Sequence, residues 1–475
     1  MEIEKPPEKL KKELEKHNQG HLLAFWDKLD AEGRGRLIAQ IEYLDFSRID
    51  QWSQFAAAGT AKAATGGNLE PPAYFPAVAS GSEQAEKYEP ARRLGRRLIS
   101  EGKIAAFLVA GGVGTRLGFD GPKGDFPISP VRHKTLFRLF AEQIMAAGRK
   151  YGCKCRWYVM TSPANDTQTR RIFESNHYFG LPPGDVFIFV QGTMPAFNLQ
   201  GRILLADRDR IARSPDGHGG SLKAVYSQGA LDDMKEHGME IISYFQVDNP
   251  LVNIFDPLFI GLHRMEGSRM SSKAVKKTDP KEKVGNFCLS NGAVAVIEYS
   301  DLPDELAVRR RKDGSLAFGL GSIAIHMIDV DFIAELNAGG FSLPLHRAVK
   351  KIPHVDGSGR FVEPEAPNGV KLESFVFDAL PLAGSSIILE TLRGEEFAPV
   401  KNAAGSDSPA TSRDLMVERA AAWLESAEVA VPRKADGSAD CVVEIAADFA
   451  LEKDDVKAKK DRISPIGRGE KVYLE

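Results

Sequence analysis

The sequence predicts an α/β fold with a mostly parallel central sheet, a helical N-terminal region and a smaller C-terminal domain. Two observations predict this class. Through the middle of the chain, short apolar runs alternate with segments of helical periodicity, which is typical of parallel sheets with helical connections. The first hundred residues show mainly helical periodicity, and a strand-then-helix pattern restarts after about Ala383. We therefore expect three domains, at residues 1–100, 101–383 and 384–475.

The N-terminal region is expected to be helical from about Pro7 to Phe46. Its apolar residues fall at helical spacing and are interpreted as packing faces. They are Leu22, Leu23, Phe25, Trp26 and Leu29, then Leu37, Ile38, Ile41 and Leu44. A segment of small residues, 56–72, is expected to be a loop or linker, and a further helix is predicted from Glu83 to Glu101.

Four short apolar strands are expected in the central domain. They are Lys103–Ala110, Arg156–Thr161, Asp185–Val190 and Ile241–Val247, with a helix predicted at His133–Lys150. In parallel sheets, ligands bind beyond the carboxyl ends of the strands. The loops after Ala110, Val190 and Val247 are therefore expected to converge on one site. In the C-terminal domain, a strand is expected within 385–392 and a helix from Thr411 to Ala427.

Composition argues against several classes of partner. The chain has 475 residues, is 43% hydrophobic and 27% charged, and carries a net charge of -3, so we expect neither nucleic acid nor a membrane as a partner. The charged N-terminus does not resemble a signal peptide, and no apolar run approaches a membrane span, so a cytoplasmic location is predicted. Four scattered cysteines are expected to be reduced thiols.

The segment Leu108–Pro127, LVAGGVGTRLGFDGPKGDFP, carries the most specific chemical signal. Glycines directly after a strand let the backbone approach a ligand and form a nest of N–H groups that binds anions. Arg116 and Lys123 lie in the same loop and are suited to neutralising phosphate charge. The last glycine comes one residue too late for the dinucleotide fingerprint, and the chain has no Gly-Lys-Ser/Thr run. The spacing therefore disfavours an NAD-dependent oxidoreductase and a P-loop protein.

The glycine-rich segment resembles the signature of the UDP-N-acetylglucosamine and UDP-sugar pyrophosphorylases, which are eukaryotic-type UTP:hexose-1-phosphate uridylyltransferases. Further motifs resemble this family in order along nearly the whole chain. They are HLLAFWDKL from His21, QGTMPAF from Gln191, SPDGHGG from Ser214, VDNPLVNIFDPLFIG from Val247, KKTDPKEKVG from Lys276, IEYSDL from Ile297, HRAVKKIPHVD from His346, KLESFVFD from Lys371 and EEFAPVKNAAGSDSP from Glu395. The resemblance implies a Rossmann-like nucleotidyltransferase domain that makes a UDP-sugar and pyrophosphate from UTP and a hexose 1-phosphate.

The resemblance also implies roles for individual residues. Nucleotide binding is implied for Ala110, Gly111, Gly112, Gly114, Thr115, Gln191, Gly217 and His218. The amide of Gln191 offers both donors and an acceptor, which suits the edge of uracil. Lys123 is expected to hold charge at the α-phosphate, with Arg116 toward the pyrophosphate, and Lys401 to bind the sugar phosphate. All three are predicted to be catalytic.

Asp248 directly follows a buried strand and is the predicted Mg²⁺ ligand. Magnesium prefers a carboxylate together with substrate phosphates. A helix cap is the alternative for an Asp at a strand end, but the Val-Asp-Asn context favours the metal. Sugar binding is implied by the resemblance for Gly285, Glu298 and Ser322.

Two departures from the family pattern bear on the sugar. His218 stands where the N-acetylglucosamine branch usually has Asn, and Gly319, Ser322 and Ile325 replace asparagines of that branch. Losing polar partners changes discrimination between related sugars. UDP-N-acetylglucosamine is the favoured product, and UDP-glucose or broad UDP-sugar activity remains an alternative, as does a catalytically silent sensor. The sequence leaves the oligomeric state open.

Overall fold

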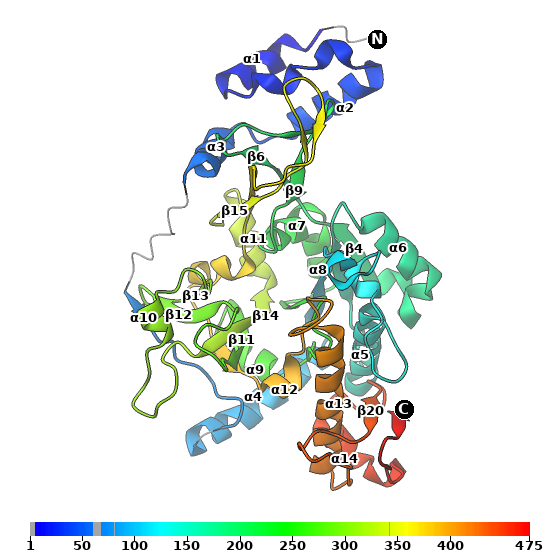
Figure 1. Ribbon diagram of the computed structural model, residues 1–475. Helices are drawn as coiled ribbons and strands as arrows, with labels where there is room; N and C mark the ends of the chain where they lie inside the picture. Colours follow the sequence, from blue (N-terminus) through cyan, green and yellow to red (C-terminus); the bar gives the residue numbers. More distant parts are fainter. Residues whose placement is uncertain (1–4, 60–67, 80, 342) are drawn as a thin grey trace. The chain divides into compact units, whose positions relative to one another are not determined.

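The computed structural model describes residues 5–59, 68–79, 81–341 and 343–475, which form two compact units (Figure 1). The first unit comprises the described residues of Met1–Ala64, Gly192–Ser221 and Leu343–Val376; the second comprises those of Thr65–Gln191, Leu222–Ser342 and Phe377–Glu475. The boundaries predicted at residues 100 and 383 do not coincide with these units. Local changes of sequence pattern carry no information about which distant segments pack together.

The first unit combines N-terminal helices with small antiparallel sheets, of which the largest has the order β15–β18–β6. Asp30 is the N-cap of α2, since its carboxylate accepts a 2.7 Å hydrogen bond from the N–H of Gly33. The bounds are α1 (Glu8–Lys16), α2 (Ala31–Glu42), α3 (Ile49–Ala57), β5 (Thr193–Pro195), β6 (Phe197–Asn198), β7 (Leu205–Asp207), β8 (Arg210–Ile211), β9 (Arg213–Pro215), β15 (His346–Lys350), β16 (His354–Val355), β17 (Phe361–Val362) and β18 (Gly369–Glu373).

Part of the segment predicted to be an N-terminal helix forms 3₁₀ turns instead of an α-helix. The apolar group that begins at Leu22 forms two 3₁₀ turns, Gly20–Leu23 and Trp26–Lys28, separated by non-helical backbone at Phe25. All three large side chains, Leu22, Phe25 and Trp26, are nevertheless buried in the core of this unit. The prediction of a packing face is therefore confirmed, while the helix is wrong, because spacing over eight residues does not separate an α-helix from successive turns. The predicted linker begins within α3, and its residues 60–67 lie outside the described residues.

The second unit contains the predicted central sheet, which has ten strands in the described residues. Their order is β1–β12–β14–β10–β2–β3–β4, with β11 beside β14, β19 beside β11 and β13 beside β12. Pairing is parallel across β10, β2, β3 and β4 and antiparallel between β10 and β14. The strands are β1 (Leu69–Glu70), β2 (Ile104–Val109), β3 (Trp157–Thr161), β4 (Val186–Val190), β10 (Ile241–Gln246), β11 (Met270–Lys276), β12 (Asn286–Ser290), β13 (Ala293–Ile297), β14 (Leu320–Asp329) and β19 (Ile388–Glu390). The predicted α/β class and its four central strands are confirmed.

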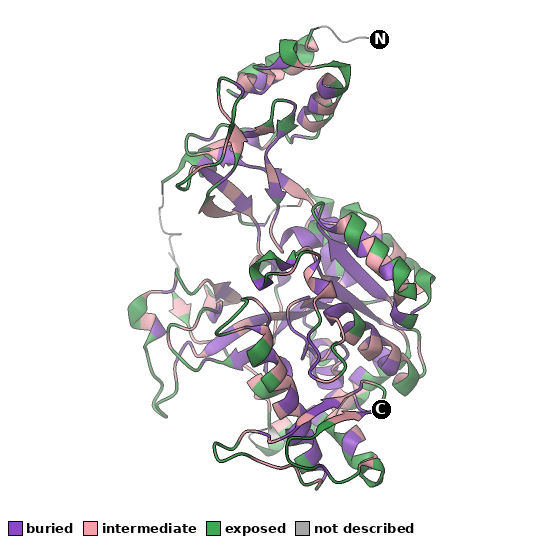
Figure 2. Cartoon of the chain, turned by 45° about the vertical axis from the view of Figure 1, so that its right-hand side comes forward, coloured by how far each residue is buried: buried purple, intermediate pink, exposed green. Residues whose placement is uncertain are grey.

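Helices accompany this sheet, and the parallel strands β2, β3 and β10 lie in the interior (Figure 2). All five residues of β3 are buried, which explains why such strands read as continuous apolar runs rather than alternating patterns. The helix bounds are α4 (Ser82–Ser100), α5 (Leu136–Tyr151), α6 (Asp166–Ser175), α8 (Ala230–Glu236), α9 (Pro257–Met265), α10 (Asp304–Ala307), α11 (Val330–Ala338), α12 (Arg393–Glu396), α13 (Pro409–Ser426) and α14 (Lys453–Ala458); α7 (Gly220–Ser227) spans the point where the chain passes between units. The helices predicted at Glu83–Glu101, His133–Lys150 and Thr411–Ala427 correspond to α4, α5 and α13.

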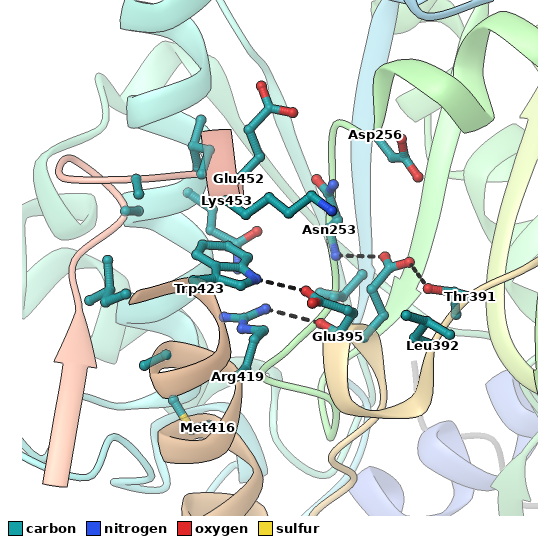
Figure 3. Close-up of a pocket in the computed structure, with 18 of the residues that line it drawn as sticks. Asn253, Asp256, Thr391, Leu392, Glu395, Met416, Arg419, Trp423, Glu452 and Lys453 are labelled. Carbon is teal, nitrogen blue, oxygen red and sulfur yellow. Dashed lines mark hydrogen bonds between the residues drawn. The ribbon is translucent and has the colours of Figure 1, made fainter. Parts of the chain in front are cut away.

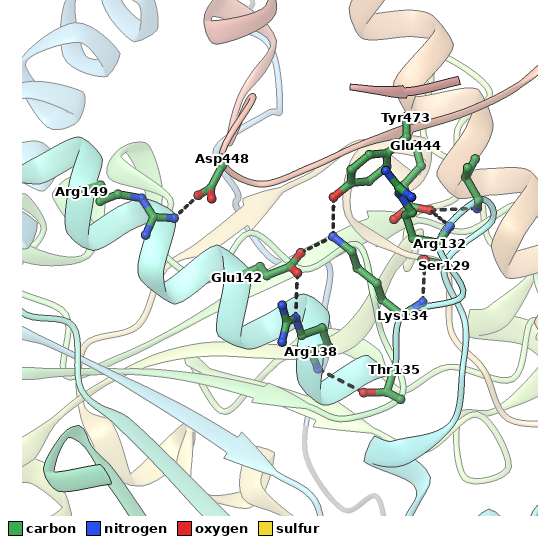
Figure 4. A network of polar contacts seen from close by, with 11 residues as sticks. Ser129, Arg132, Lys134, Thr135, Arg138, Glu142, Arg149, Glu444, Asp448 and Tyr473 are labelled. Carbon is green, nitrogen blue, oxygen red and sulfur yellow. Dashed lines mark hydrogen bonds and ion pairs between the residues drawn. The ribbon is translucent and has the colours of Figure 1, made fainter. Parts of the chain in front are cut away.

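The C-terminal part of the chain is attached to the sheet domain through specific polar contacts (Figure 4). Strand β19 pairs in parallel with β11, so the central sheet extends past the predicted boundary at residue 383. Beyond it, β20 (Val442–Ile445) and β21 (Lys471–Leu474) form a small parallel pair. The carboxylate of Glu444 accepts 2.8 Å hydrogen bonds from the N–H groups of Val131 and Arg132, and Lys134 Nζ donates to Glu142 at 2.7 Å and to Tyr473 at 2.5 Å.

Two further expectations from composition are tested by the fold. All four cysteines are free thiols, as predicted. Within the described part of the chain, no helix has the length and apolar character that crossing a bilayer requires.

Candidate active site

The four parallel strands deliver their following loops to one edge of the sheet. Strands β2, β3, β4 and β10 end at Val109, Thr161, Val190 and Gln246, and they run in the same direction. The N–H of Val247 donates to the carbonyl of Val109 at 3.1 Å, so the residues that follow β10 and β2 are neighbours. The convergence expected for the loops after Ala110, Val190 and Val247 is therefore present.

The backbone of the glycine loop, defined here as residues 110–123, is held by side chains of the next strand end. Asn165 Nδ2 donates to the carbonyls of Ala110 at 2.8 Å and Gly112 at 3.1 Å, and Ser162 Oγ donates to the carbonyl of Gly111 at 2.8 Å. Within the described ranges, the N–H groups of Gly111, Gly112 and Val113 donate to no protein acceptor. The loop thus presents a row of donors suited to an anion.

Gln191 and Lys123 lie against this row of donors. A Cβ atom added to Gly111 would lie 3.0 Å from Gln191 Oε1, and one added to Gly112 would lie 3.8 Å from Lys123 Cε. The N–H of Lys123 also donates to the carbonyl of Gly112 at 3.1 Å, which fixes the start of its side chain. Thr115 and Arg116 are exposed on the 3₁₀ turn Gly114–Leu117 of the same loop. Seven predicted residues of the loop, with Gln191, therefore share one region.

Asp248 and Lys401 come from distant parts of the chain and meet at this edge. The N–H of Val400 donates to the carbonyl of Asp248 at 2.8 Å, so Lys401 follows directly after a residue bonded to the predicted metal ligand. The Lys401 ammonium lies 3.9 Å from Asp407 Oδ2 and 5.7 Å from the ring of Phe397, and 41% of its side chain is exposed. The lysine segment, defined here as residues 396–407, thus brings a cation to the end of β10.

The three residues predicted to bind sugar are also close together. The N–H of Ser322 donates to the carbonyl of Gly285 at 2.8 Å. A Cβ atom at Gly285 would lie 2.5 Å from Val296 Cγ1, 3.7 Å from Ser322 Cβ and 4.0 Å from Glu298 Oε1, so the three predicted residues are neighbours and Val296 leaves no room for a side chain at Gly285. By contrast, Ile325 is 1% exposed in the main core, so its replacement of an asparagine is a packing feature rather than a loss of a pocket residue.

Gly217 and His218 belong to the other compact unit and are described within it. Gly217 has a φ of +83°, and the N–H of Val376 donates to His218 Nδ1 at 3.0 Å. His218 stacks on Phe375 with ring centroids 5.0 Å apart, and His346 stacks on Phe375 at 4.1 Å. Burial, with the neighbouring His346, lowers the pKa of His218 to about 4, so its ring is neutral at pH 7, with Nδ1 acting as the acceptor.

The residues around Asp248 fit a metal that is held jointly with substrate. Among the described residues there is no cluster of three or more His, Cys, Asp or Glu side chains able to hold an ion. A half-buried carboxylate at a strand end, beside a loop suited to phosphates, matches magnesium, which uses one or two carboxylates plus substrate phosphates. Asp248 is therefore compatible with Mg²⁺ that arrives with a nucleotide.

Several residues of this region were missed by sequence reasoning. Ser162 and Asn165 hold the glycine loop, and they follow β3 just as Asp248 follows β10, so the strand-end rule could have found them. Asn249 lies within the Val-Asp-Asn motif and bonds the lysine segment on both sides of Phe397. Lys273 and Glu396 form a buried ion pair across 123 positions of sequence, for which no local signal exists.

A parallel-stranded α/β unit that places a glycine loop with available N–H donors and a carboxylate beside a lysine segment at its strand ends has the architecture of the nucleotidyltransferase class. The sequence model of the family described as UTP–glucose-1-phosphate uridylyltransferase matches residues 82–467. The chain therefore belongs to this family of UDP-sugar pyrophosphorylases, which are uridylyltransferase enzymes.

Individual relatives agree with this assignment. The chain is 36% identical over 437 residues to the UDP-N-acetylhexosamine pyrophosphorylase-like protein 1 of Xenopus tropicalis, covering 88% of this chain and 85% of that protein. It is 35% identical over 432 residues to the UDP-N-acetylglucosamine pyrophosphorylase of Saccharomyces cerevisiae, covering 86% and 89%. The crystal structure of the Trypanosoma brucei uridine diphosphate N-acetylglucosamine pyrophosphorylase, in complex with an inhibitor, superimposes with a TM-score of 0.82 at 26% identity, covering 98% of this chain and 97% of that one.

Proposed function

We propose that this enzyme transfers the uridylyl group of UTP to N-acetylglucosamine 1-phosphate, releasing pyrophosphate. The observation that supports the proposal best is the meeting of the glycine loop, Gln191, Asp248 and Lys401 at one edge of the sheet. An oxygen of the sugar phosphate attacks the α-phosphorus of UTP in line, a new P–O bond forms, and the bond to the pyrophosphate oxygen breaks. The nucleophile is already an anion, so no general base is required.

Catalysis in this proposal comes from positioning and charge neutralisation. The N–H row of the glycine loop binds phosphate oxygens, and Gln191 reads the edge of uracil. Lys123 holds the charge that develops at the α-phosphate, Arg116 faces the leaving pyrophosphate, and Lys401 holds the phosphate of the sugar. Asp248 would hold Mg²⁺, which when bound offsets repulsion between the two anionic substrates.

The choice of sugar is based on the names of relatives and on the group formed by Gly285, Glu298 and Ser322. Relatives of similar length are named for N-acetylhexosamine or N-acetylglucosamine products. Ser322, between Gly285 and Glu298, offers a hydroxyl to the substrate where the family resemblance leads us to expect an amide. UDP-glucose or broad UDP-sugar activity is the second candidate, favoured by Ser322 and by His218. We also propose that the enzyme is located in the cytoplasm.

The test is pyrophosphate release with UTP and Mg²⁺, offering the 1-phosphates of N-acetylglucosamine, N-acetylgalactosamine, glucose and galactose in parallel. We expect the highest kcat/KM with N-acetylglucosamine 1-phosphate. A preference for glucose or galactose 1-phosphate would establish the second candidate instead. If none of the four sugar 1-phosphates were turned over, the proposal would be contradicted, and a catalytically silent nucleotide-sugar sensor would be the remaining function.

A Ser322→Asn variant sharpens the specificity test. Restoring an amide is expected to raise kcat/KM for the N-acetyl sugars relative to glucose 1-phosphate by about 10-fold, because one extra buried hydrogen bond to a substrate amide changes discrimination by that order. An unchanged ratio would show that residue 322 does not contact the substituent at the second carbon.

A further inference from the structure

The lysine segment depends on a group of buried polar residues that the proposed mechanism does not use. The carboxylate of Glu396, at the start of this segment, accepts hydrogen bonds from Thr391 Oγ1 at 2.6 Å and from the N–H of Asn253 at 3.0 Å. Only 8% of its side chain is exposed. Next to it, Glu395 accepts a 2.8 Å hydrogen bond from Trp423 Nε1, and its carbonyl accepts one of 3.2 Å from Arg419 (Figure 3).

Lys273 provides the positive charge that this buried carboxylate requires. Its ammonium lies 2.5 Å from Glu396 Oε2 and 2.7 Å from Asp256 Oδ2, and 1% of its side chain is exposed. Burial alone would lower the pKa of Lys273, and the attraction of Asp256 and Glu396 more than offsets this, so its pKa is raised. Lys273 lies in β11 at the point where the register with β14 shifts. The start of the lysine segment is thus fixed to the central sheet.

Asn249 fixes the same segment to the end of β10. Its Nδ2 donates to the carbonyl of Glu396 at 2.7 Å, and its Oδ1 accepts from the N–H of Ala398 at 3.1 Å. Asn249 is 4% exposed and directly follows Asp248. Two residues further along the segment, Val400 bonds the carbonyl of Asp248. The side chain of Asn249 and the backbone of Asp248 therefore hold the chain at Glu396, Ala398 and Val400, directly before Lys401.

We propose that Asn249 and the Lys273–Glu396 pair are positioning residues that set the distance between Lys401 and the Asp248 site. This inference rests on the proposed function and assigns the placement of Lys401 to buried residues that the proposed mechanism does not use. A shift of about 1 Å in a substrate-holding group can cost on the order of 100-fold in rate, so a buried and fully bonded support is what such a lysine needs. The glycine loop makes none of these contacts, and its affinity for UTP should not depend on them.

The experiment is a double-mutant cycle between positions 249 and 401 in the full-length enzyme. We expect Asn249→Ala to lower kcat/KM for the sugar 1-phosphate by about 10- to 100-fold. Binding of UTP alone, measured by calorimetry, should stay within about twofold of wild type. In a Lys401→Ala background, Asn249→Ala should cause little further loss, because its effect acts through that lysine.

The control is Asn337→Ala, which removes a similarly buried amide that bonds the carbonyls of Leu222 and Ile333 instead of the lysine segment. In the double variant, the fold-losses of kcat/KM caused by Asn337→Ala and by Lys401→Ala should multiply. If Asn249→Ala lowers thermal stability too far, Glu396→Gln, which keeps the shape and removes the charge, takes its place in the cycle. Full multiplication of the Asn249 or Glu396 effect with that of Lys401→Ala would overturn the positioning proposal. A Lys401→Ala enzyme with normal turnover would instead contradict the role of Lys401 in the proposed function.

Discussion

The glycine loop and the lysine segment hold their places by different means. The glycine loop is fixed by Ser162 and Asn165, which lie within about fifty residues of it in the sequence and bond its carbonyls directly. The lysine segment is fixed by the buried amide of Asn249 and by the buried ion pair of Lys273, across 149 and 123 positions. The comparison teaches that the glycine loop, which would bind the nucleotide in the proposed function, is supported across 51 to 55 positions, whereas the lysine segment, which would bind the sugar phosphate, needs contacts across more than 120.

Lys273→Met is expected to cause the largest change, because it leaves Asp256 and Glu396 buried without their cation. Breaking a buried ion pair in this way costs about 3–5 kcal/mol of folding free energy. Chemical denaturation of both proteins would measure it. Lys281→Met is the control, since Lys281 pairs with Asp304 at 3.4 Å with side chains 72% and 88% exposed, and the loss should stay below about 1 kcal/mol. Equal losses in the two variants would contradict the difference between the two regions.

The folding stability of the wild type and of Lys273→Met, measured as a function of pH, provides a further test. Lys273 keeps the pKa of Asp256 below its ordinary value, so in the wild type the contribution of Asp256 is present above the unfolded pKa of about 4 and is lost as the pH falls through the folded pKa. In Lys273→Met the buried carboxylates favour protonation, so acid relieves their repulsion. The stability difference between the two proteins should therefore shrink as the pH falls from 7 toward 4. A constant difference would show that the charges are not the cause.

Lys123→Ala tests the nucleotide end by its chemistry. Removing one preorganised cation is expected to lower kcat by about 100- to 1,000-fold with little change in folding stability. Lys154→Ala, at an exposed lysine outside the site, is the control. Full activity in Lys123→Ala would contradict the role assigned to the glycine loop.

Asn165→Ala tests whether that loop depends on its local support. The variant removes the bonds to the carbonyls of Ala110 and Gly112, so we expect UTP affinity to fall by about 10-fold and stability to fall by about 1–3 kcal/mol. Asn176→Ala, an exposed amide just after α6, should leave both unchanged. If the UTP affinity of Asn165→Ala equalled that of the wild type, the glycine loop would hold its conformation without the support of the residues that follow β3.

Asp407→Asn is expected to have the smallest effect. Its carboxylate lies 3.9 Å from the ammonium of Lys401, and both side chains are 41% exposed. Exposed pairs of this kind contribute about 0–1 kcal/mol, so KM for the sugar 1-phosphate should change by no more than about twofold. Asn also tolerates the positive φ of 54° at this position. A larger change would mean that Asp407, rather than the buried pair, governs Lys401.

The same contrast explains what the sequence could predict. Strands β2, β3, β4 and β10 are short apolar runs, and the residues that follow them could be assigned to one edge by the rule for parallel sheets. The antiparallel half of the sheet, and the addition of β19, depend on pairing between distant segments and had no comparable signal. Asp248 and Lys401 could each be named from motifs, but their meeting through Val400, and the support from Lys273, required the fold.

Strand β19 has a consequence for the order in which the protein is made. It lies between β11 and the segment around Phe75, with the carbonyl of Ile388 accepting a 2.9 Å hydrogen bond from the N–H of Phe75. A nascent chain on the ribosome therefore exposes the unpaired edge of β11 until residue 390 has emerged, although strands β2, β3, β4 and β10 have all been made by residue 246. Exposed strand edges of this kind attract other chains. Truncated products that stop before β19 should consequently be the ones that chaperones retain.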